Sequence, residues 1–209
     1  MIVPEVEAGH ISSANHIPSK NHIKGTAMPR LATPASIETS PEASRPLLDA
    51  VKKQLGVVPN LFRLVGNSPA GLEGFLGLMG ALSKGQLEAA TRERIALTVA
   101  EINRCDYCLS AHTYLGRNLA KLSDVEMAAN RDGGSTDPKA AIAVRFAKEI
   151  VRTRGNVSDA DVKAVKQAGY SDAQIIEIVL HVALNTLTNY VNVVAKTDID
   201  FDVVTANAA

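Results

Sequence analysis

The chain is poor in the residues that mark several large classes of protein. It contains no tryptophan, aromatic residues make up 4% of it, and only two of its 209 residues are cysteines. Because aromatic rings are so few, a stacking site for a flat cofactor is disfavoured. The length is sufficient for one sizeable hydrophobic core, and length alone leaves a second domain open.

An excess of charge of one sign is also missing. Lysine plus arginine and aspartate plus glutamate both number 22, so the formal net charge is zero. No basic block or basic-aromatic patch offsets this balance, which argues against nucleic acid as a partner. The longest apolar runs, such as IALTVA and IIEIVLHVAL, are shorter than the roughly 18 residues of a membrane-spanning helix. We therefore expect no membrane partner.

The N-terminus, MIVPEVEAGHISSANHIPSK, lacks the basic start and apolar core of a secretory signal, so we expect a cytoplasmic protein. Thiols stay reduced there, and a close cysteine pair is more often catalytic or metal-binding than structural. Residues 1–38 show no sustained periodicity, so we expect a flexible N-terminal arm. Its histidines, His10, His16 and His22, have no partners at ligand spacing and are expected to be solvated.

Residues 39–204 are predicted to form one all-α domain of about eight or nine helices. Apolar residues recur at helical spacing, strict apolar-polar alternation is absent, and Ser, Pro and Gly punctuate the pattern. The predicted helices span residues 40–56, 59–68, 69–85, 87–103, about 104–121, 124–134, 137–155, 158–169 and 171–196. Four serines, Ser40, Ser123, Ser158 and Ser171, are predicted helix caps.

The last predicted helix is apolar over most of its circumference, which predicts a central or interface helix. One polar stripe interrupts it, formed by His181, Asn185, Thr188 and Asn192 at spacings of four, three and four residues. Such a stripe lines a pocket, bonds across a subunit contact, or is a set of satisfied buried polar groups. The sequence leaves these alternatives open.

Both cysteines lie in the segment TRERIALTVAEINRCDYCLSAHTYLG, residues 91–116. On a helix that starts near Cys105, the side chains of Cys105, Cys108 and His112 share one face. The Cα atoms of residues three apart lie about 5 Å from each other, which a disulfide accepts. A position in the first turn favours thiolate, and His112 stands one turn beyond Cys108, where an imidazole can take the thiol proton.

Glu93 stands in the preceding predicted helix. Its neighbours on the same helical face are Ala89, Ala96, Leu97 and Ala100. A carboxylate on an inward, alanine-rich face needs a partner, because a buried unpaired charge is costly. If the next helix packs antiparallel after a short turn, the cysteine face meets Glu93, which then orients His112 or transfers protons itself.

Three interpretations of these four residues compete. The cysteines are inert buried side chains, or they bind zinc with His112 and a fourth ligand, for which Glu93 or His181 would have to serve. The third is a dithiol redox centre, and it is favoured because it gives Glu93, Cys105, Cys108 and His112 each a role. A non-enzymatic helical oligomer with a redox-sensing or structural pair of cysteines remains the alternative.

The arrangement Glu93-x11-Cys105-x2-Cys108-x3-His112 resembles the motif of the alkyl hydroperoxidase D-like branch of the carboxymuconolactone decarboxylase family. Flanking segments GVVPNLFRLVGNSP, SDADVKAVKQAGYSDAQIIEIV and LTNYVNVVAKTDIDF are similar too, so the resemblance covers roughly residues 28–204. One departure is Tyr107, because the founding enzyme of the branch has His before its second cysteine. The decarboxylase branch lacks the cysteine pair, so decarboxylation is disfavoured.

The resemblance implies an all-helical thiol peroxidase that assembles as a homo-oligomer, often a trimer or hexamer. Cys108 would be the peroxide-reducing thiolate, Cys105 the resolving cysteine, and Glu93 with His112 the proton relay. The substrate would be a hydroperoxide and the electron donor a dithiol, in the founding enzyme a lipoyl-bearing protein. No metal or other cofactor is required.

Overall fold

The computed structural model describes residues 29–208, and the three arm histidines lie outside these residues. Within this range the chain folds into nine α-helices and one 3-10 helix, with no strand. In chain order these are η1 Glu42–Ser44, α1 Arg45–Leu55, α2 Asn60–Val65, α3 Pro69–Ser83, α4 Ala89–Ile102, α5 Asp106–Asn118, α6 Asp124–Arg131, α7 Pro138–Thr153, α8 Asp159–Gln167 and α9 Asp172–Ala195. The prediction of an all-α domain with eight or nine helices is confirmed.

Helix starts follow local capping chemistry. The side chains of Ser123, Ser158 and Ser171 each accept a hydrogen bond from the backbone amide three residues on, as predicted. Such a bond satisfies one of the amides that a helix start leaves unpaired. Gly56 ends α1 with φ at 78°, a left-handed conformation that glycine adopts without steric cost.

The prediction of Ser40 as a helix cap is wrong. Its hydroxyl donates to the carbonyl of Ser36, 2.9 Å away, so it closes the preceding turn instead. The chain then enters α1 through the short 3-10 helix η1, with Pro41 as its first flanking residue. A serine hydroxyl can donate to a preceding carbonyl or accept from a following amide. The residue type alone therefore did not place the start of this helix correctly.

The described end of the predicted arm, residues 29–38, is irregular and contacts the helical body. The Arg30 amide donates to the carbonyl of Ala195 at 2.8 Å, and the Asn67 side chain donates to the carbonyl of Ala32 at 2.9 Å. These bonds hold the segment against the ends of α9 and α2.

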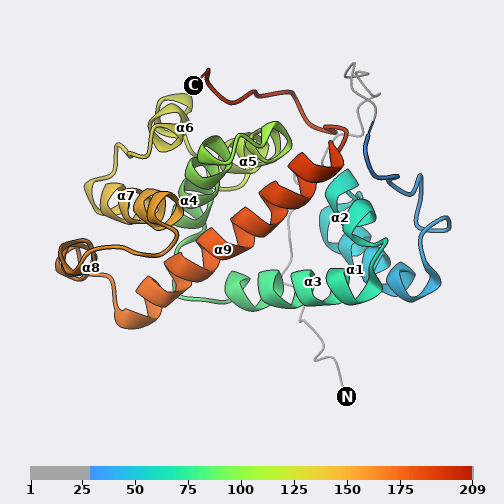
Figure 1. The fold of residues 1–209 in the computed structure, drawn as a ribbon, viewed down its shortest axis with the longest axis horizontal. Coiled ribbons are helices and arrows are strands. Elements are labelled where there is room, and N and C mark those ends of the chain that lie inside the picture. Colours follow the sequence, from blue (N-terminus) through green and yellow to red (C-terminus); the bar gives the residue numbers. More distant parts are fainter. Residues whose placement is uncertain (1–28, 209) are drawn as a thin grey trace.

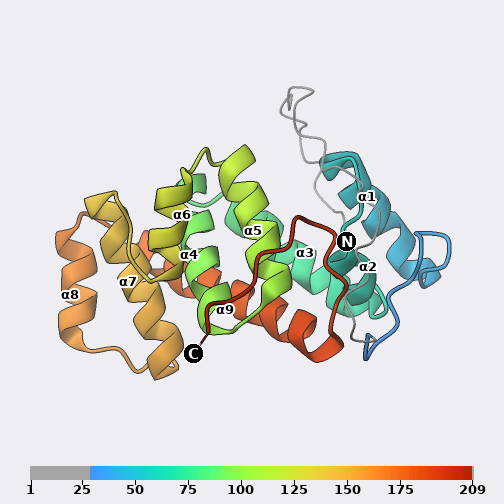
Figure 2. The ribbon, with the colours of Figure 1, turned by 90° about the horizontal axis from the view of Figure 1, so that it is seen from above.

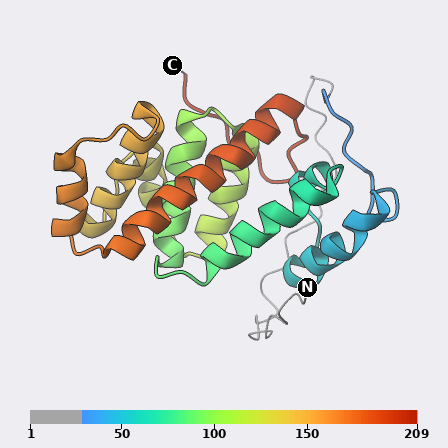
Figure 3. The ribbon, with the colours of Figure 1, turned by 60° about the horizontal axis from the view of Figure 1, so that its bottom comes forward.

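Helices α4 and α9 organise the molecule. In Figure 1, α9 runs diagonally across the fold, with α7 and α8 near its start, α1 and α2 near its end, and α3 running below it between the two. Figure 3 shows the same helix from its exposed side. Helix α4 contacts α5, α6, α7 and α9. Its Leu97 belongs to one hydrophobic cluster and its Val99 to the other, so the two halves of the core meet along α4.

Helix α9 has a buried face and an exposed apolar face. The exposed large apolar side chains are Ile176, Val179, Leu180, Leu187, Tyr190, Val193 and Val194. In the described part of the chain, α9 is the one helix with the length and apolar character to cross a membrane, and half of that window is buried inside the fold. Core helices of this kind pass the same test, so it gives little support to a membrane span.

After α9 the chain returns over α5, and Figure 2 shows this C-terminal segment crossing that helix. The Val204 amide donates to the Ser110 hydroxyl at 2.9 Å, and the Ala206 amide donates to the Asp106 carboxylate at 2.8 Å. Phe201 packs edge-on against the ring of Tyr107. The segment thus covers the first turns of α5, where the cysteines lie.

Candidate active site

A tight turn between α4 and α5 places the cysteine pair. Arg104 has φ at 54° and reverses the chain, and the Cys105 amide then donates to the carbonyl of Ala100 at 3.0 Å. Cys105 is the N-cap of α5, and its sulfur accepts from the backbone amide of Cys108 at 3.3 Å. The pair therefore occupies the helix start, where unpaired amides and the helix dipole favour negative charge.

Both thiols are free and buried. Cys105 is 1% exposed and Cys108 is 3% exposed, within a hydrophobic cluster that includes Leu97 and Leu109. A sulfur in such surroundings does not exchange freely with solvent reagents. Any chemistry at these sulfurs therefore depends on groups that the fold itself supplies.

A hydrogen bond joins the side chains of Glu93 and His112 beside the cysteines. The Glu93 Oε2 and His112 Nδ1 atoms are 2.8 Å apart, and both side chains are 21% exposed. Burial lowers the pKa of His112, but the Glu93 charge and hydrogen bond outweigh it and leave the pKa raised. The contact with Glu93 fixes the ring and leaves Nε2 as the nitrogen that can exchange a proton.

The two cysteines differ in acidity. Burial alone raises the pKa of Cys108, but hydrogen bonds from Cys105 and Asn192 and the charge of His112 bring it down to about 7. The hydrogen bond with Cys108 and burial raise the pKa of Cys105 far above the usual range. The directions of these two shifts favour the thiolate form, which is the nucleophilic form, at Cys108 rather than at Cys105.

Two asparagines of α9 complete the surroundings of Cys108. Asn192 Nδ2 donates to the Cys108 sulfur at 3.3 Å, and Asn189 Oδ1 accepts from Asn103 Nδ2 at 2.9 Å. The sequence placed Asn192 in a polar stripe without giving it a partner, and it gave Asn189 no role. A signal was available, because Asn189 lies one turn from Asn192 on an otherwise apolar helix.

Among the described residues, no hydrogen bond joins the rest of the predicted stripe to the cysteines. Asn185 donates to the carbonyl of His181, and Thr188 donates to the carbonyl of Asn185, so both satisfy themselves within α9. Burial and the nearby Arg92 lower the pKa of His181 to about 4, so its ring is neutral at pH 7. For Asn185 and Thr188, the alternative of satisfied buried polar groups is the one that the structure fits.

Tyr107 points away from the sulfurs, in line with its place on the helical projection. Its hydroxyl accepts from the Leu61 amide at 3.1 Å, and burial raises its pKa. A neutral phenol in this position braces α5 against α2 and the C-terminal segment. Tyr107 therefore does not act at the sulfurs in place of the histidine that the founding enzyme has at this position.

The described residues contain no group of three or more His, Cys, Asp or Glu side chains arranged to hold a metal ion. A tetrahedral zinc site needs four such ligands, or three and a water. In particular, the Glu93 carboxylate bonds to the His112 ring at Nδ1, and neither residue is arranged with the cysteines as a metal-ligand group.

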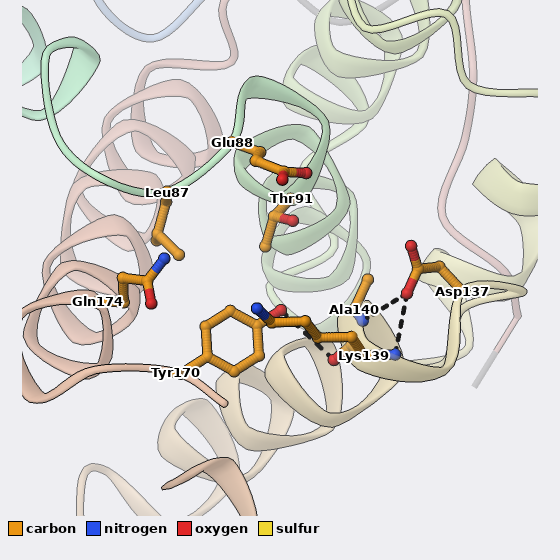
Figure 4. A pocket seen from close by; sticks show the side chains of 8 residues that line it. All are labelled: Leu87, Glu88, Thr91, Asp137, Lys139, Ala140, Tyr170 and Gln174. Carbon is orange, nitrogen blue, oxygen red and sulfur yellow. Dashed lines mark hydrogen bonds between the residues drawn. The ribbon is translucent and has the colours of Figure 1, made fainter. Parts of the chain in front are cut away.

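A separate cavity of about 110 Å³ lies near the starts of α4, α7 and α9. Figure 4 shows Asp137 bonded to the backbone amides of Lys139 and Ala140, and the Lys139 side chain beside the Tyr170 ring. The ammonium lies 4.8 Å from the ring centre. The lining groups thus serve as a helix cap and a cation–π pair, and none of the cysteine-site residues lies here.

Residues 69–149, which contain Glu93, both cysteines and His112, match the model of the carboxymuconolactone decarboxylase family. This segment, less than half of the chain, is what the sequence shares with that family. No curated protein matches the sequence.

Solved structures share the fold. A peroxidase-related protein from Silicibacter sp. TM1040 superposes with a TM-score of 0.71 at 24% identity, over 83% of this chain and 94% of that one. Another from Ralstonia eutropha JMP134, described as an alkylhydroperoxidase AhpD core, gives a TM-score of 0.72 at 24% identity, over 82% and 92%. The debrominase Bmp8 gives 0.69 at 20% identity, over 83% and 94%. The predicted resemblance is confirmed for the fold by these structures and, over residues 69–149, by the match to the family model.

Proposed function

We propose that the protein is a thiol-dependent peroxidase that reduces hydroperoxides through Cys108 and Cys105. The observation that carries this proposal is the placement of both cysteines at the start of α5, where the Cys105 sulfur accepts from the Cys108 amide at 3.3 Å and the bonded Glu93 and His112 side chains lie nearby. The lowered pKa of Cys108 and the raised pKa of Cys105 agree with this assignment. The names of the peroxidase-related structural neighbours support the same class of chemistry.

In the first half of the reaction, His112 takes the proton of Cys108, and Glu93 stabilises the imidazolium. The thiolate attacks one peroxide oxygen, so that an S–O bond forms and the O–O bond breaks. The leaving alkoxide takes the proton from His112 and departs as an alcohol, while Cys108 becomes a sulfenic acid. Two electrons have passed from sulfur to the peroxide.

In the second half, the thiol of Cys105 attacks the sulfenic sulfur of Cys108. An S–S bond forms, the S–O bond breaks, and the hydroxyl leaves as water with the proton of Cys105. An external dithiol then reduces the disulfide in two thiol-exchange steps and is itself oxidised to a disulfide. The close approach of the two cysteines at the start of α5 supports this assignment of roles.

The burial of the sulfurs restricts the electron donor. At 1% and 3% exposure, neither cysteine can meet a cysteine on the surface of a folded partner directly. A small dithiol, or a lipoyl arm carried by a partner protein, is thin enough to enter beside Glu93 and His112, which are partly exposed. We place this reaction in a compartment that keeps dithiols reduced, such as the cytoplasm.

We also propose that the chain forms a homo-oligomer, a trimer or hexamer as in the family it resembles, through the exposed apolar face of α9. Glu177, the one charged residue of the helix between Ile176 and Val194, is bonded to the Gln86 and Leu87 amides, so it leaves the face apolar. The seven large apolar side chains of this face are 37% to 59% exposed, and a contiguous exposed apolar patch of this kind marks interaction surfaces.

The association is tested by sedimentation of the full chain and of Tyr190→Glu. We expect the variant to sediment as a monomer and the parent as an oligomer. Val125→Glu is the matched control, because Val125 is also exposed and apolar but lies on α6. A monomeric parent protein at micromolar concentration would refute this surface assignment.

The peroxidase proposal is tested by hydroperoxide consumption with dihydrolipoamide as reductant, together with titration of free thiols. We expect repeated turnover that depends on both reagents. The alternative is a redox-sensing pair without turnover, which the deep burial of both sulfurs favours. In that case peroxide oxidises the pair slowly and no reductant sustains the reaction.

A further inference from the structure

We propose that the side-chain amides of Asn192 and Asn189 on α9 form a cradle that holds the Cys108 sulfur as a thiolate. The inference deepens the proposed function, since it concerns the sulfur that we expect to attack the peroxide. It assigns to the last helix a part of the site that the cysteine motif does not contain.

The first amide of the cradle belongs to Asn192. Its Nδ2 lies 3.3 Å from the Cys108 sulfur, across 84 residues of sequence, and the side chain is 3% exposed. Its Oδ1 is buried and has no hydrogen-bond partner among the described residues. A buried side-chain amide that makes a single hydrogen bond destabilises the folded protein, unless that bond is strong and charge-assisted. A thiolate makes the bond strong, whereas a neutral thiol does not.

The second amide belongs to Asn189, which is completely buried. Its Oδ1 is engaged by Asn103, so the NH₂ end of the amide is turned the other way. Within the described part of the chain, that Nδ2 has no hydrogen bond of ordinary geometry. The same amide helps to lower the pKa of Cys108. Asn103 at the end of α4 therefore orients a donor that serves the sulfur on α5.

The cradle contributes to a balance of opposing influences on the protonation of Cys108, in which the bond from Cys105 is the largest that favours thiolate. Burial raises the pKa of Cys108, and it is the largest single influence. Hydrogen bonds and the charge of His112 act against it. Removing one donor to a charged group shifts a pKa by about one to two units. Asn192→Leu, which keeps the side-chain volume and removes the donor, is therefore expected to return Cys108 to the thiol form at pH 7.

The test measures the ultraviolet absorbance of thiolate as a function of pH, in full-length protein without peroxide. We expect the midpoint of the parent protein near pH 7 and that of Asn192→Leu about one to two units higher. Thr188→Val is the control, because Thr188 is buried one turn away on α9 and bonds only within its own helix. An unchanged midpoint in folded Asn192→Leu, or an equal shift in the control, would overturn the proposal.

A second measurement needs no variant and covers the case in which Asn192→Leu does not fold. In parent protein labelled with ¹⁵N-asparagine, side-chain amide signals should move with the same pH midpoint as the thiolate absorbance. No such movement in any asparagine side chain contradicts the cradle. Neither measurement depends on peroxide turnover. If the parent protein fails to consume peroxide but its thiolate responds to Asn192→Leu, the proposed function fails and the cradle stands.

Discussion

The pH dependence of peroxide reduction follows from the pKa of about 7 for Cys108. With that value, the thiolate fraction is about 9% at pH 6 and about 91% at pH 8, a rise of about tenfold. An ordinary cysteine with a pKa near 8.5 would rise about 80-fold over the same range and continue to rise above pH 8. The two pKa values therefore predict pH–rate curves that differ in steepness between pH 6 and pH 8 and in whether the rate levels off above pH 8.

The protonation of His112 adds a second, falling limb to the pH profile of peroxide reduction. Glu93 raises the pKa of His112, so the imidazolium that protonates the leaving alkoxide persists to higher pH than in an isolated histidine. We expect kcat/KM to rise through about pH 7 as Cys108 ionises and to fall again above it as His112 loses its proton. The apparent pKa values belong to the coupled pair of groups rather than to either residue alone.

The assay is the initial rate of hydroperoxide loss at limiting peroxide and saturating dithiol, between pH 5.5 and 9.5. The same buffers are used for the thiolate absorbance of the protein without peroxide. The rising limb of the rate and the absorbance midpoint should coincide near pH 7. A rate that increases steadily beyond pH 8.5 would refute the assignment of Cys108 as an activated thiolate.

Three further predictions concern single residues. Cys108→Ser should abolish peroxide turnover, whereas Cys105→Ser should consume one peroxide per site and then stop. Full peroxidase activity in both variants would contradict the assigned roles. Glu93→Gln should slow peroxide reduction by about a hundredfold. It should leave thermal unfolding nearly unchanged, because partly exposed pairs of this kind contribute about 0–1 kcal/mol to stability. A large loss of stability would mark Glu93 as structural. Glu126→Gln should destabilise the fold by about 3 kcal/mol at pH 7, because it leaves the partly buried Arg94 without its carboxylate partner. Burial opposes ionisation of Glu126, but hydrogen bonds from Ser135, Thr136 and Asn130 hold its pKa far below the usual value. The stability that the Glu126 carboxylate contributes is therefore present above about pH 4.5 and is lost as the pH falls. If thermal unfolding shows the same loss of stability in Glu126→Gln at pH 7 and at pH 3, the pair with Arg94 is not its source.

The helices were predictable because their signals are local. Ser158 and Ser171 stand directly before acidic residues and an amphipathic pattern, and both form complete capping boxes. Ser40 misled for an equally local reason, since its hydroxyl found an acceptor behind it rather than an amide ahead. Local chemistry thus gives the number and position of helices, with errors at their ends.

The candidate site was predictable where it rests on one helix and its neighbour. The spacing of Cys105, Cys108 and His112 fixes their common face, and the inward position of Glu93 predicted its need for a partner, which is His112. The contribution of α9 was not predictable in this way. Which face of α9 meets α5 depends on packing across the whole domain, so nothing near Asn192 in the sequence indicates Cys108.

Glu126 illustrates the same limit. It stands in the third position of a capped helix, where a glutamate normally faces solvent and complements the helix dipole. In the fold it is 3% exposed and joins α6 to Arg94 on α4 and to the loop before α7. Its role depends on three segments that meet only after folding, and no pattern in the local sequence encodes that meeting.

The central claim is that Cys108 and Cys105 reduce one hydroperoxide and become a disulfide. The most direct test adds one equivalent of hydroperoxide to fully reduced protein under anaerobic conditions and measures free thiols and the peptide map by mass spectrometry. The mechanism predicts the loss of two thiols, one Cys105–Cys108 disulfide, and full recovery of both thiols with dihydrolipoamide. Protein that retains both thiols, or that accumulates Cys108 sulfinic acid without a disulfide, would contradict it.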